Sequence, residues 1–186
     1  MPAARLRVTG GSARGIPLVE PRGVRLRPTA GVVREALFNI LGQSVEGAAV
    51  LDLFAGTGAL GIEALSRGAV RAVFVEAEAA SCQAILQSLA RTGFSGRGTV
   101  VRGRLPGALA SLNGPFNLIF LDPPYDATDV DTLLVALVPL AAPGATIVYE
   151  HGSRYNPPER PAGLRLVDRR VYGDSALAFY ALEEGE

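Results

Sequence analysis

The chain has 186 residues, of which 48% are hydrophobic and 19% charged, enough for one folded domain with a sizeable core. No apolar run approaches the roughly 20 residues of a membrane span, and the N-terminus has no apolar signal region, so we expect a cytoplasmic protein without a membrane anchor. A single cysteine, Cys82, excludes an internal disulfide. With only one histidine, His151, a zinc site is disfavoured and no metal is expected.

A net charge of zero hides an uneven distribution of basic side chains, all of which are arginines. Residues 1–34 carry a net charge of +6, because Glu20 is opposed by seven arginines at positions 5, 7, 14, 22, 25, 27 and 34. Arginine suits phosphate because its planar fork donates two hydrogen bonds at once, so a polyanion partner is one interpretation, with Arg7 and Arg14 as phosphate contacts. The other interpretation is coding bias in a segment that is merely solvated.

The predicted elements begin with this basic segment. "RLRVT" (5–9) and "IPLVE" (16–20) flank the turn-rich "GGSARG", which indicates a small β-hairpin or an irregular basic arm. We predict a basic arm over residues 1–28 and a single domain over 29–186. The domain opens with an amphipathic helix in "AGVVREALFNIL" (30–41), whose apolar side chains fall at helical spacing at Val33, Ala36, Leu37, Ile40 and Leu41.

From residue 49 onward, predicted strands and helices alternate. Strands are predicted at 49–54, 71–76, 98–103, 116–122 and 144–151, and helices at 60–67, 78–92, 106–112 and 130–141. Two further strands, 164–172 and 175–183, are joined by Gly173-Asp174 and predict a closing antiparallel hairpin. The pattern is typical of an α/β fold with a doubly wound, mainly parallel sheet, which binds ligands at the carboxyl ends of its strands. The loops after Phe54, Glu76 and Asp122 are therefore the candidate site.

The first of these loops contains a literal G-x-G-x-x-G in "VLDLFAGTGALGIEAL" (50–65). Such a loop directs a helix N-terminus at a ligand, and Glu76 falls where an acid that binds ribose hydroxyls is expected. NAD would place a pyrophosphate here, but the carboxylate of Asp52 would repel phosphate and attract the ammonium and sulfonium groups of S-adenosylmethionine. Asp52 therefore favours S-adenosylmethionine, unless it merely caps the strand end.

The loop after the fourth strand reads Asp122-Pro123-Pro124-Tyr125. Two prolines fix a stiff turn without N–H donors, so nearby carbonyls can face a ligand, while Asp122 supplies an acceptor and Tyr125 an aromatic surface. Acceptors beside a stacking ring suit the exocyclic amine of a planar base. Accepting its protons orients the nitrogen lone pair toward a methyl sulfonium and stabilises the charge that develops. The alternative is a proline-rich turn with a packed tyrosine.

The motifs "FAGTG" and "DPPY" together resemble amino-methyltransferases of nucleobases. With "GGSARGIPL", "LRPTAGVVREALFNIL", "YEH" and "YGDSALAFY" in order, nearly the whole chain resembles the RsmD-type family of bacterial 16S rRNA guanine-N2 methyltransferases. The resemblance implies a Rossmann-like class I methyltransferase with a seven-stranded sheet. It also implies direct methyl transfer from S-adenosylmethionine, without metal or covalent enzyme intermediate, to 16S rRNA in an assembling or assembled small ribosomal subunit.

The resemblance also assigns roles to individual residues. It implies that Asp122 and Pro123 accept hydrogen bonds from the target amine and that Tyr125, beside Pro124, stacks on the base. Arg27, Thr29 and Arg34, ahead of the glycine loop, are candidates for the cofactor carboxylate or the substrate. Asp122 also borders the cofactor, whose other implied contacts are Asp52, Phe54, Ala55, Gly56, Thr57, Gly58 and Glu76.

Three positions depart from the family pattern. No acid follows the third strand in "VVRGRLPGAL", so backbone or packing near Leu105 must hold the adenine. Ser88 stands where the family often has asparagine, and Ala30-Gly31-Val32 where it often has Thr-Asp-Arg. The DPPY motif alone leaves adenine N6 methylation of DNA or RNA open, and a non-catalytic RNA-binding protein with a vestigial pocket is a further alternative. We expect a monomer, although no sequence feature bears on it.

Overall fold

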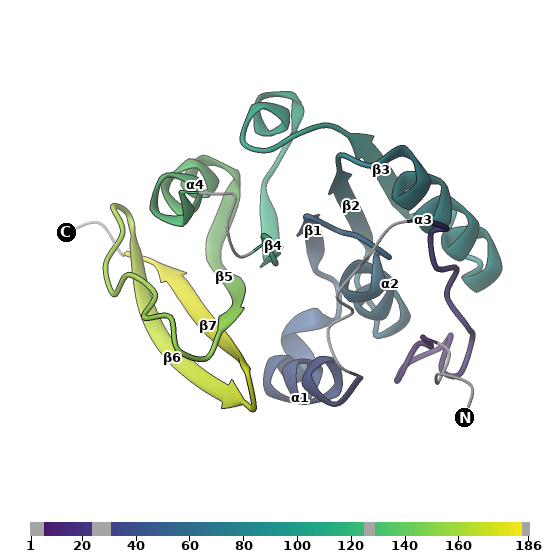
Figure 1. Ribbon diagram of the computed structural model, residues 1–186, viewed down its shortest axis with the longest axis horizontal. Helices are drawn as coiled ribbons and strands as arrows, with labels where there is room; N and C mark the ends of the chain where they lie inside the picture. The colour runs from purple at the N-terminus through teal and green to yellow at the C-terminus, as the bar shows by residue number, and fades with distance from the viewer. Residues whose placement is uncertain (1–5, 24–30, 125–128, 184–186) are drawn as a thin grey trace.

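The computed structural model describes residues 6–23, 31–124 and 129–183, which form one seven-stranded sheet with helices on both faces (Figure 1). The strand order is β3-β2-β1-β4-β5-β7-β6. The strands are β1 Ala49–Leu53, β2 Arg71–Glu76, β3 Gly98–Arg102, β4 Phe116–Leu121, β5 Ala141–Gly152, β6 Leu164–Tyr172 and β7 Ser175–Leu182.

Parallel pairing runs from β3 to β5, and the C-terminal strands reverse it. β7 pairs antiparallel with both β5 and β6, so the hairpin around Gly173 closes the sheet as predicted. All five residues of β1 are buried, in keeping with a continuous apolar run covered on both faces. The predicted doubly wound α/β fold is therefore confirmed.

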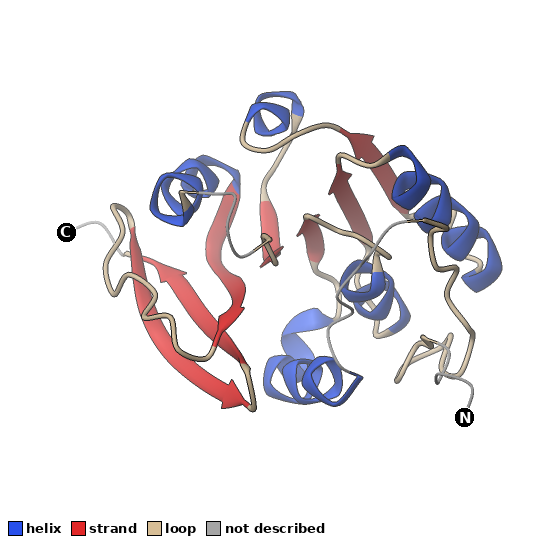
Figure 2. Cartoon of the chain, viewed as in Figure 1, coloured by secondary structure: helices blue, strands red, loops and turns tan. Residues whose placement is uncertain are grey.

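Two helical layers cover the sheet (Figure 2). α1 (Gly31–Leu41), α2 (Ala59–Ser66) and α3 (Ala79–Thr92) share one core cluster, which includes Leu37, Ile62 and Ile85. The 3-10 helix η2 (Gly107–Ser111) and α4 (Val130–Leu137) share the other, which includes Leu109 and Leu134. The remaining helical turns are η1 (Gly42–Val45) and η3 (Val138–Leu140).

In the N-terminal third, the structure corrects one sequence prediction and narrows another that had two alternatives. In α1 the buried stripe includes Arg34 and Phe38, whereas Ile40 is 43% exposed, because the helix turns its 33-34-37-38-41 face to the core. Of the two forms predicted for the arm, the hairpin is reduced over residues 6–23 to an isolated antiparallel bridge between Arg7 and Pro17, with backbone hydrogen bonds from Val8 to Ile16 and from Leu18 to Leu6. Contacts with α2 and α3 also hold the arm, as described below.

Over the described ranges, none of the helices is long and apolar enough to cross a membrane.

Candidate active site and the docked arm

The strand register brings the three candidate loops to one edge of the sheet. Leu53 of β1 pairs with Val75 of β2 on one side and with Leu121 of β4 on the other. The residues that follow these three, Phe54, Glu76 and Asp122, therefore lie at the same level along the sheet edge. The predicted carboxyl-edge site is thus assembled by parallel pairing alone.

The glycine loop is built from left-handed backbone. Phe54, Gly56 and Gly58 have φ values of 55°, 56° and 72°. An aromatic residue in this region costs about 1–3 kcal/mol, and such strain is typically kept where a binding loop requires it. The loop is tied to β2, since the Ala55 N–H donates to the Val75 carbonyl at 3.1 Å. Within the loop, the Gly58 N–H donates to the Ala55 carbonyl at 2.7 Å.

Helix α2 starts behind this loop and lies close to β2. A Cβ on Gly61 would come within 2.3 Å of the Phe74 ring, so the third glycine of the motif permits close packing of helix on sheet. The carboxylate of Asp52, 2% exposed, accepts a hydrogen bond from the Gly61 N–H at 2.9 Å. Burial raises the pKa of Asp52 to about 7, opposed by that hydrogen bond. Asp52 therefore links the end of β1 to the first turn of α2, and a cofactor contact stays a prediction.

Glu76 joins the two loops on the β1–β2 side. Its Oε2 accepts from the Gly56 N–H at 2.8 Å and its Oε1 from the Glu78 N–H at 2.9 Å. The half-buried carboxylate is thus held at the glycine loop, where a ribose with two hydroxyl donors would meet an acceptor. Thr57 is buried and Ala55 packs against the core of the α2 face, so both contribute to the loop's shape.

The turn after β4 lies at the same edge. Asp122 is half-buried, Pro123 buried and Pro124 exposed, while Tyr125 lies outside the described residues. Leu105 follows β3, where the Gly103 N–H donates to the Glu76 carbonyl at 3.0 Å, and it packs against the α4-side core. The segment after β3 thus contributes an apolar side chain at Leu105.

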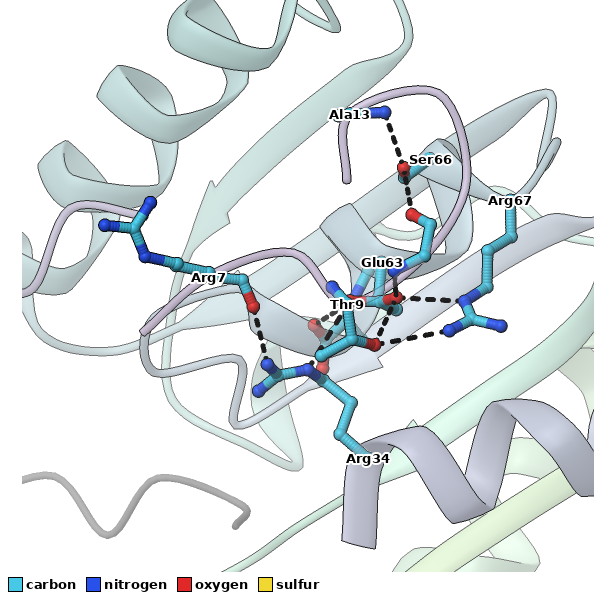
Figure 3. A network of polar contacts seen from close by, with 10 residues as sticks. Arg7, Thr9, Ala13, Arg34, Glu63, Ser66 and Arg67 are labelled. Atoms are coloured by element: carbon cyan, nitrogen blue, oxygen red, sulfur yellow. Dashed lines mark hydrogen bonds and ion pairs between the residues drawn. The ribbon is translucent and has the colours of Figure 1, made fainter. Parts of the chain in front are cut away.

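The basic arm docks on α2 through a buried carboxylate that the sequence prediction missed (Figure 3). Glu63, 1% exposed, accepts from the Thr9 N–H at 2.8 Å, the Thr9 hydroxyl at 2.7 Å and the Gly10 N–H at 2.7 Å. Arg67 Nε donates to it at 2.9 Å, and Arg34 Nε lies 3.5 Å from it. An acid in an otherwise apolar helix, beside an arm rich in arginine, was the available signal.

Backbone contacts complete the docking. Ser12 N–H donates to the Ser66 carbonyl at 2.8 Å and Ala13 N–H to the Ser66 hydroxyl at 2.9 Å. Gly11 has a φ of 77°, and a Cβ there would lie 1.9 Å from the Ser66 carbonyl oxygen. Farther along, Val19 N–H donates to the hydroxyl of Ser88 on α3 at 2.8 Å. The serine that departs from the family pattern therefore anchors the arm.

The prediction that Arg34 contacts the substrate or the cofactor needs correction. Its side chain is 2% exposed, donates from NH2 to the Arg7 carbonyl at 2.7 Å and pairs with Glu63, so it binds the arm instead. Burial lowers the pKa of Arg34, opposed by Glu63. Arg7 and Arg14 have exposed side chains, while the proposed contacts Arg27 and Thr29 lie outside the described residues.

The acceptor groups and the backbone of this site fit S-adenosylmethionine. A strained loop with glycines leaves room for close approach, Glu76 offers acceptors for hydroxyls, and the buried Asp52 carboxylate offers charge for a cation. Within residues 6–23, 31–124 and 129–183, no group of three or more His, Cys, Asp or Glu side chains could hold a metal ion.

The sheet order, with a glycine loop after β1 and an Asp-Pro-Pro turn after β4, defines a Rossmann-like class I methyltransferase fold. The family model described as "Conserved hypothetical protein 95" matches residues 6–181. The chain belongs to this family. The "Ribosomal RNA small subunit methyltransferase D" of Escherichia coli is 36% identical to it, over 99% of this chain and 94% of the relative.

Two further similarities agree. The protein called "Putative rRNA methyltransferase YlbH" in Bacillus subtilis is 34% identical, over 94% of this chain and 98% of the relative. The solved structure "Putative methyltransferase yhhF from Escherichia coli" superposes with a TM-score of 0.83 at 35% identity, over 98% of this chain and 100% of that chain. The predicted family and fold are therefore confirmed.

Proposed function

We propose that this protein transfers the methyl group of S-adenosylmethionine to the exocyclic N2 of a guanine in 16S rRNA of the small ribosomal subunit. The observation that carries the proposal is the strand register, which sets the glycine loop, Glu76 and the Asp122-Pro123-Pro124 turn at one edge of the sheet. The names of the relatives support rRNA as the substrate class.

When bound, S-adenosylmethionine supplies an electrophilic methyl group carried on a sulfonium ion. On the side of β1, β2 and β3, Glu76 would bind the ribose hydroxyls, Leu105 would pack on the adenine, and the Asp52 carboxylate would favour the cationic end. On the β4 side, the carboxylate of Asp122 and the carbonyl of Pro123 accept hydrogen bonds from the amine. These acceptors aim the nitrogen lone pair and stabilise the positive charge that grows on the nitrogen.

The two halves of the proposal are tested by two substitutions with opposite expected signatures. Asp122→Ala should lower the transfer rate by about 10²-fold or more with little change in cofactor affinity, as for loss of one preorganised transition-state contact. Glu76→Ala should weaken cofactor binding by about 1–3 kcal/mol, because its acceptors for the ribose are lost. Single-turnover rates and calorimetry separate the two effects.

The product identifies the target. Labelled methyl transfer to isolated small subunits and to naked 16S rRNA, followed by nucleoside analysis, should give N2-methylguanosine. N6-methyladenosine would refute the guanine assignment. Cofactor binding without transfer to either substrate would refute the enzymatic role and favour an RNA-binding protein with a vestigial pocket.

A further inference from the structure

A cavity of about 330 Å³ opens beside the Pro123–Pro124 turn, at the low end of the range for small-ligand pockets. Its walls include both prolines, the start of α4 and the C-terminal end of β5. It lies on the β4 side of the site, where the target amine is proposed to be held. Its size suits a single base better than a longer segment of chain.

Tyr155 is an aromatic residue on the wall of this cavity whose side chain is 44% exposed. Its ring is nevertheless held in place, because it meets the Tyr149 ring edge-on at 6.2 Å and the His151 ring at 5.7 Å between centroids. A partly exposed ring that is fixed by neighbours offers a stacking surface at little cost in side-chain entropy.

The backbone around Tyr155 is tethered as well. Arg169 of β6 donates from NH2 to the Ser153 carbonyl at 2.6 Å and to the Tyr155 carbonyl at 3.2 Å. Tyr155 N–H donates to the Gly152 carbonyl at 3.0 Å, and Ser153 N–H to the Asp174 carbonyl at 2.8 Å. The segment that presents the ring is therefore fastened to the closing hairpin, and its placement depends on Arg169.

The polar lining favours a base over a phosphate. Asp129 and Asp131 border the cavity, and carboxylates repel phosphate but accept from N–H donors. His151 is 2% exposed and also lines the cavity, and its Nε2 has no hydrogen-bond partner within the part of the chain that the structure describes. Guanine presents neighbouring N–H donors on its Watson–Crick edge, whereas adenine alternates donor and acceptor.

We propose that Tyr155 stacks on the target guanine while the Asp122-Pro123-Pro124 turn holds its amine, and that Arg169 is the positioning residue for Tyr155. This inference rests on the proposed function and adds a second wall to the base site. Burial, followed by the nearby Asp131 and Asp129 carboxylates, raises the pKa of Tyr155, so its hydroxyl stays protonated at neutral pH.

The ring is tested with two substitutions that separate stacking from the hydroxyl. Tyr155→Leu should lower kcat/KM for small ribosomal subunits by about 5- to 150-fold, the range for loss of one base–aromatic stack. Tyr155→Phe should stay within about twofold of wild type, because the ring remains. Val167→Ala is the matched control, since Val167 is similarly exposed at 48% but does not line the cavity.

Three outcomes would overturn the role of Tyr155: unchanged kcat/KM in Tyr155→Leu, an equal loss in Tyr155→Phe, or a parallel loss of S-adenosylmethionine affinity by calorimetry. Because stacking involves no charge, the salt dependence of RNA binding should be the same in wild type and Tyr155→Leu. A wild-type protein that transfers no methyl group would refute the proposed function itself, which distinguishes the two failures.

The positioning role of Arg169 is tested by a double-mutant cycle. Arg169→Gln should lower kcat/KM in the wild-type background but have little further effect in Tyr155→Leu, because it acts through the ring. Arg169→Lys should recover part of the loss by keeping one donor. Fully additive losses, or losses that follow only the thermal stability of the variants, would refute positioning and leave Arg169 a merely structural residue.

Discussion

At the N-terminal end of helix α2, Asp52 brings a buried carboxylate against Gly61, and the burial raises its pKa to about 7. Within the same helix, Glu63 is equally buried but receives three donors from the arm and one from Arg67, with Arg34 alongside. The Asp52 carboxylate accepts from the Gly61 N–H, and its raised pKa means that it is partly protonated near neutral pH. The Glu63 carboxylate is neutralised and holds the chain together. Environment, and not residue type, separates the two carboxylates.

The largest expected effect on stability comes from removing the Glu63 carboxylate that holds the arm. Glu63→Leu should lower the free energy of unfolding by about 3–5 kcal/mol, because the Arg34 charge and the arm's donors stay buried without their acceptor. Denaturant unfolding measures the loss. Pairing it with Arg34→Met should restore only part of the stability, since the unpaired Arg34 charge is removed while the Thr9 and Gly10 donors still lack their acceptor. A loss below about 1 kcal/mol for the single variant would show that the network does not hold the arm.

The burial of Asp52 predicts that the stability of the protein depends on pH. The pKa of Asp52 is about 7 in the folded state and about 4 when unfolded, so the folded state binds the proton more tightly. The contribution of Asp52 to the free energy of unfolding is therefore fully present below about pH 4. It is lost as pH rises toward 7, by up to about 4 kcal/mol.

Asp52→Asn removes this titration while its side-chain oxygen can still accept from Gly61. The stability difference between variant and wild type should therefore shift in favour of the variant from about pH 4 to pH 8. Thermal unfolding across that range measures the shift. Parallel stability curves for the two proteins would mean that burial does not raise the pKa of Asp52, and the predicted pH dependence would be refuted.

Arg7 and Arg14 of the docked arm are exposed, and their guanidinium groups do not pair with Glu63. They therefore test whether the arm also binds RNA. If Arg7 and Arg14 contact phosphates, replacing both with alanine should weaken RNA binding and flatten its log–log salt slope by about 1–2 units. Replacing both with lysine keeps the charges and should leave the slope near that of wild type. Filter binding at several salt concentrations measures the slopes. Equal slopes in all three proteins would indicate a solvated arm.

Sequence reasoning reached the parts of the molecule that local pattern determines. Alternating apolar segments predicted the sheet, and parallel pairing then placed Phe54, Glu76 and Asp122 together. Contacts between segments distant in the chain were not accessible in this way. Arg34 was assigned to a ligand because its partner Glu63 is 29 residues away along the chain. Tyr155 was overlooked because only the fold sets it beside Pro124.

The smallest effect concerns Ser88, which the family pattern marked as a departure and the structure shows to accept from the Val19 N–H. Ser88→Ala should cost about 1 kcal/mol, the usual worth of one hydrogen bond, and should speed hydrogen exchange at the Val19 amide. Ser81→Ala is the matched control. Ser81 lies on the same helix and is equally buried, but its hydroxyl has no partner within the described ranges. Its removal should leave Val19 exchange unchanged, because no arm contact depends on it. Equal acceleration in both variants would mean that α3 itself loosens, and that Ser88 does not specifically anchor the arm.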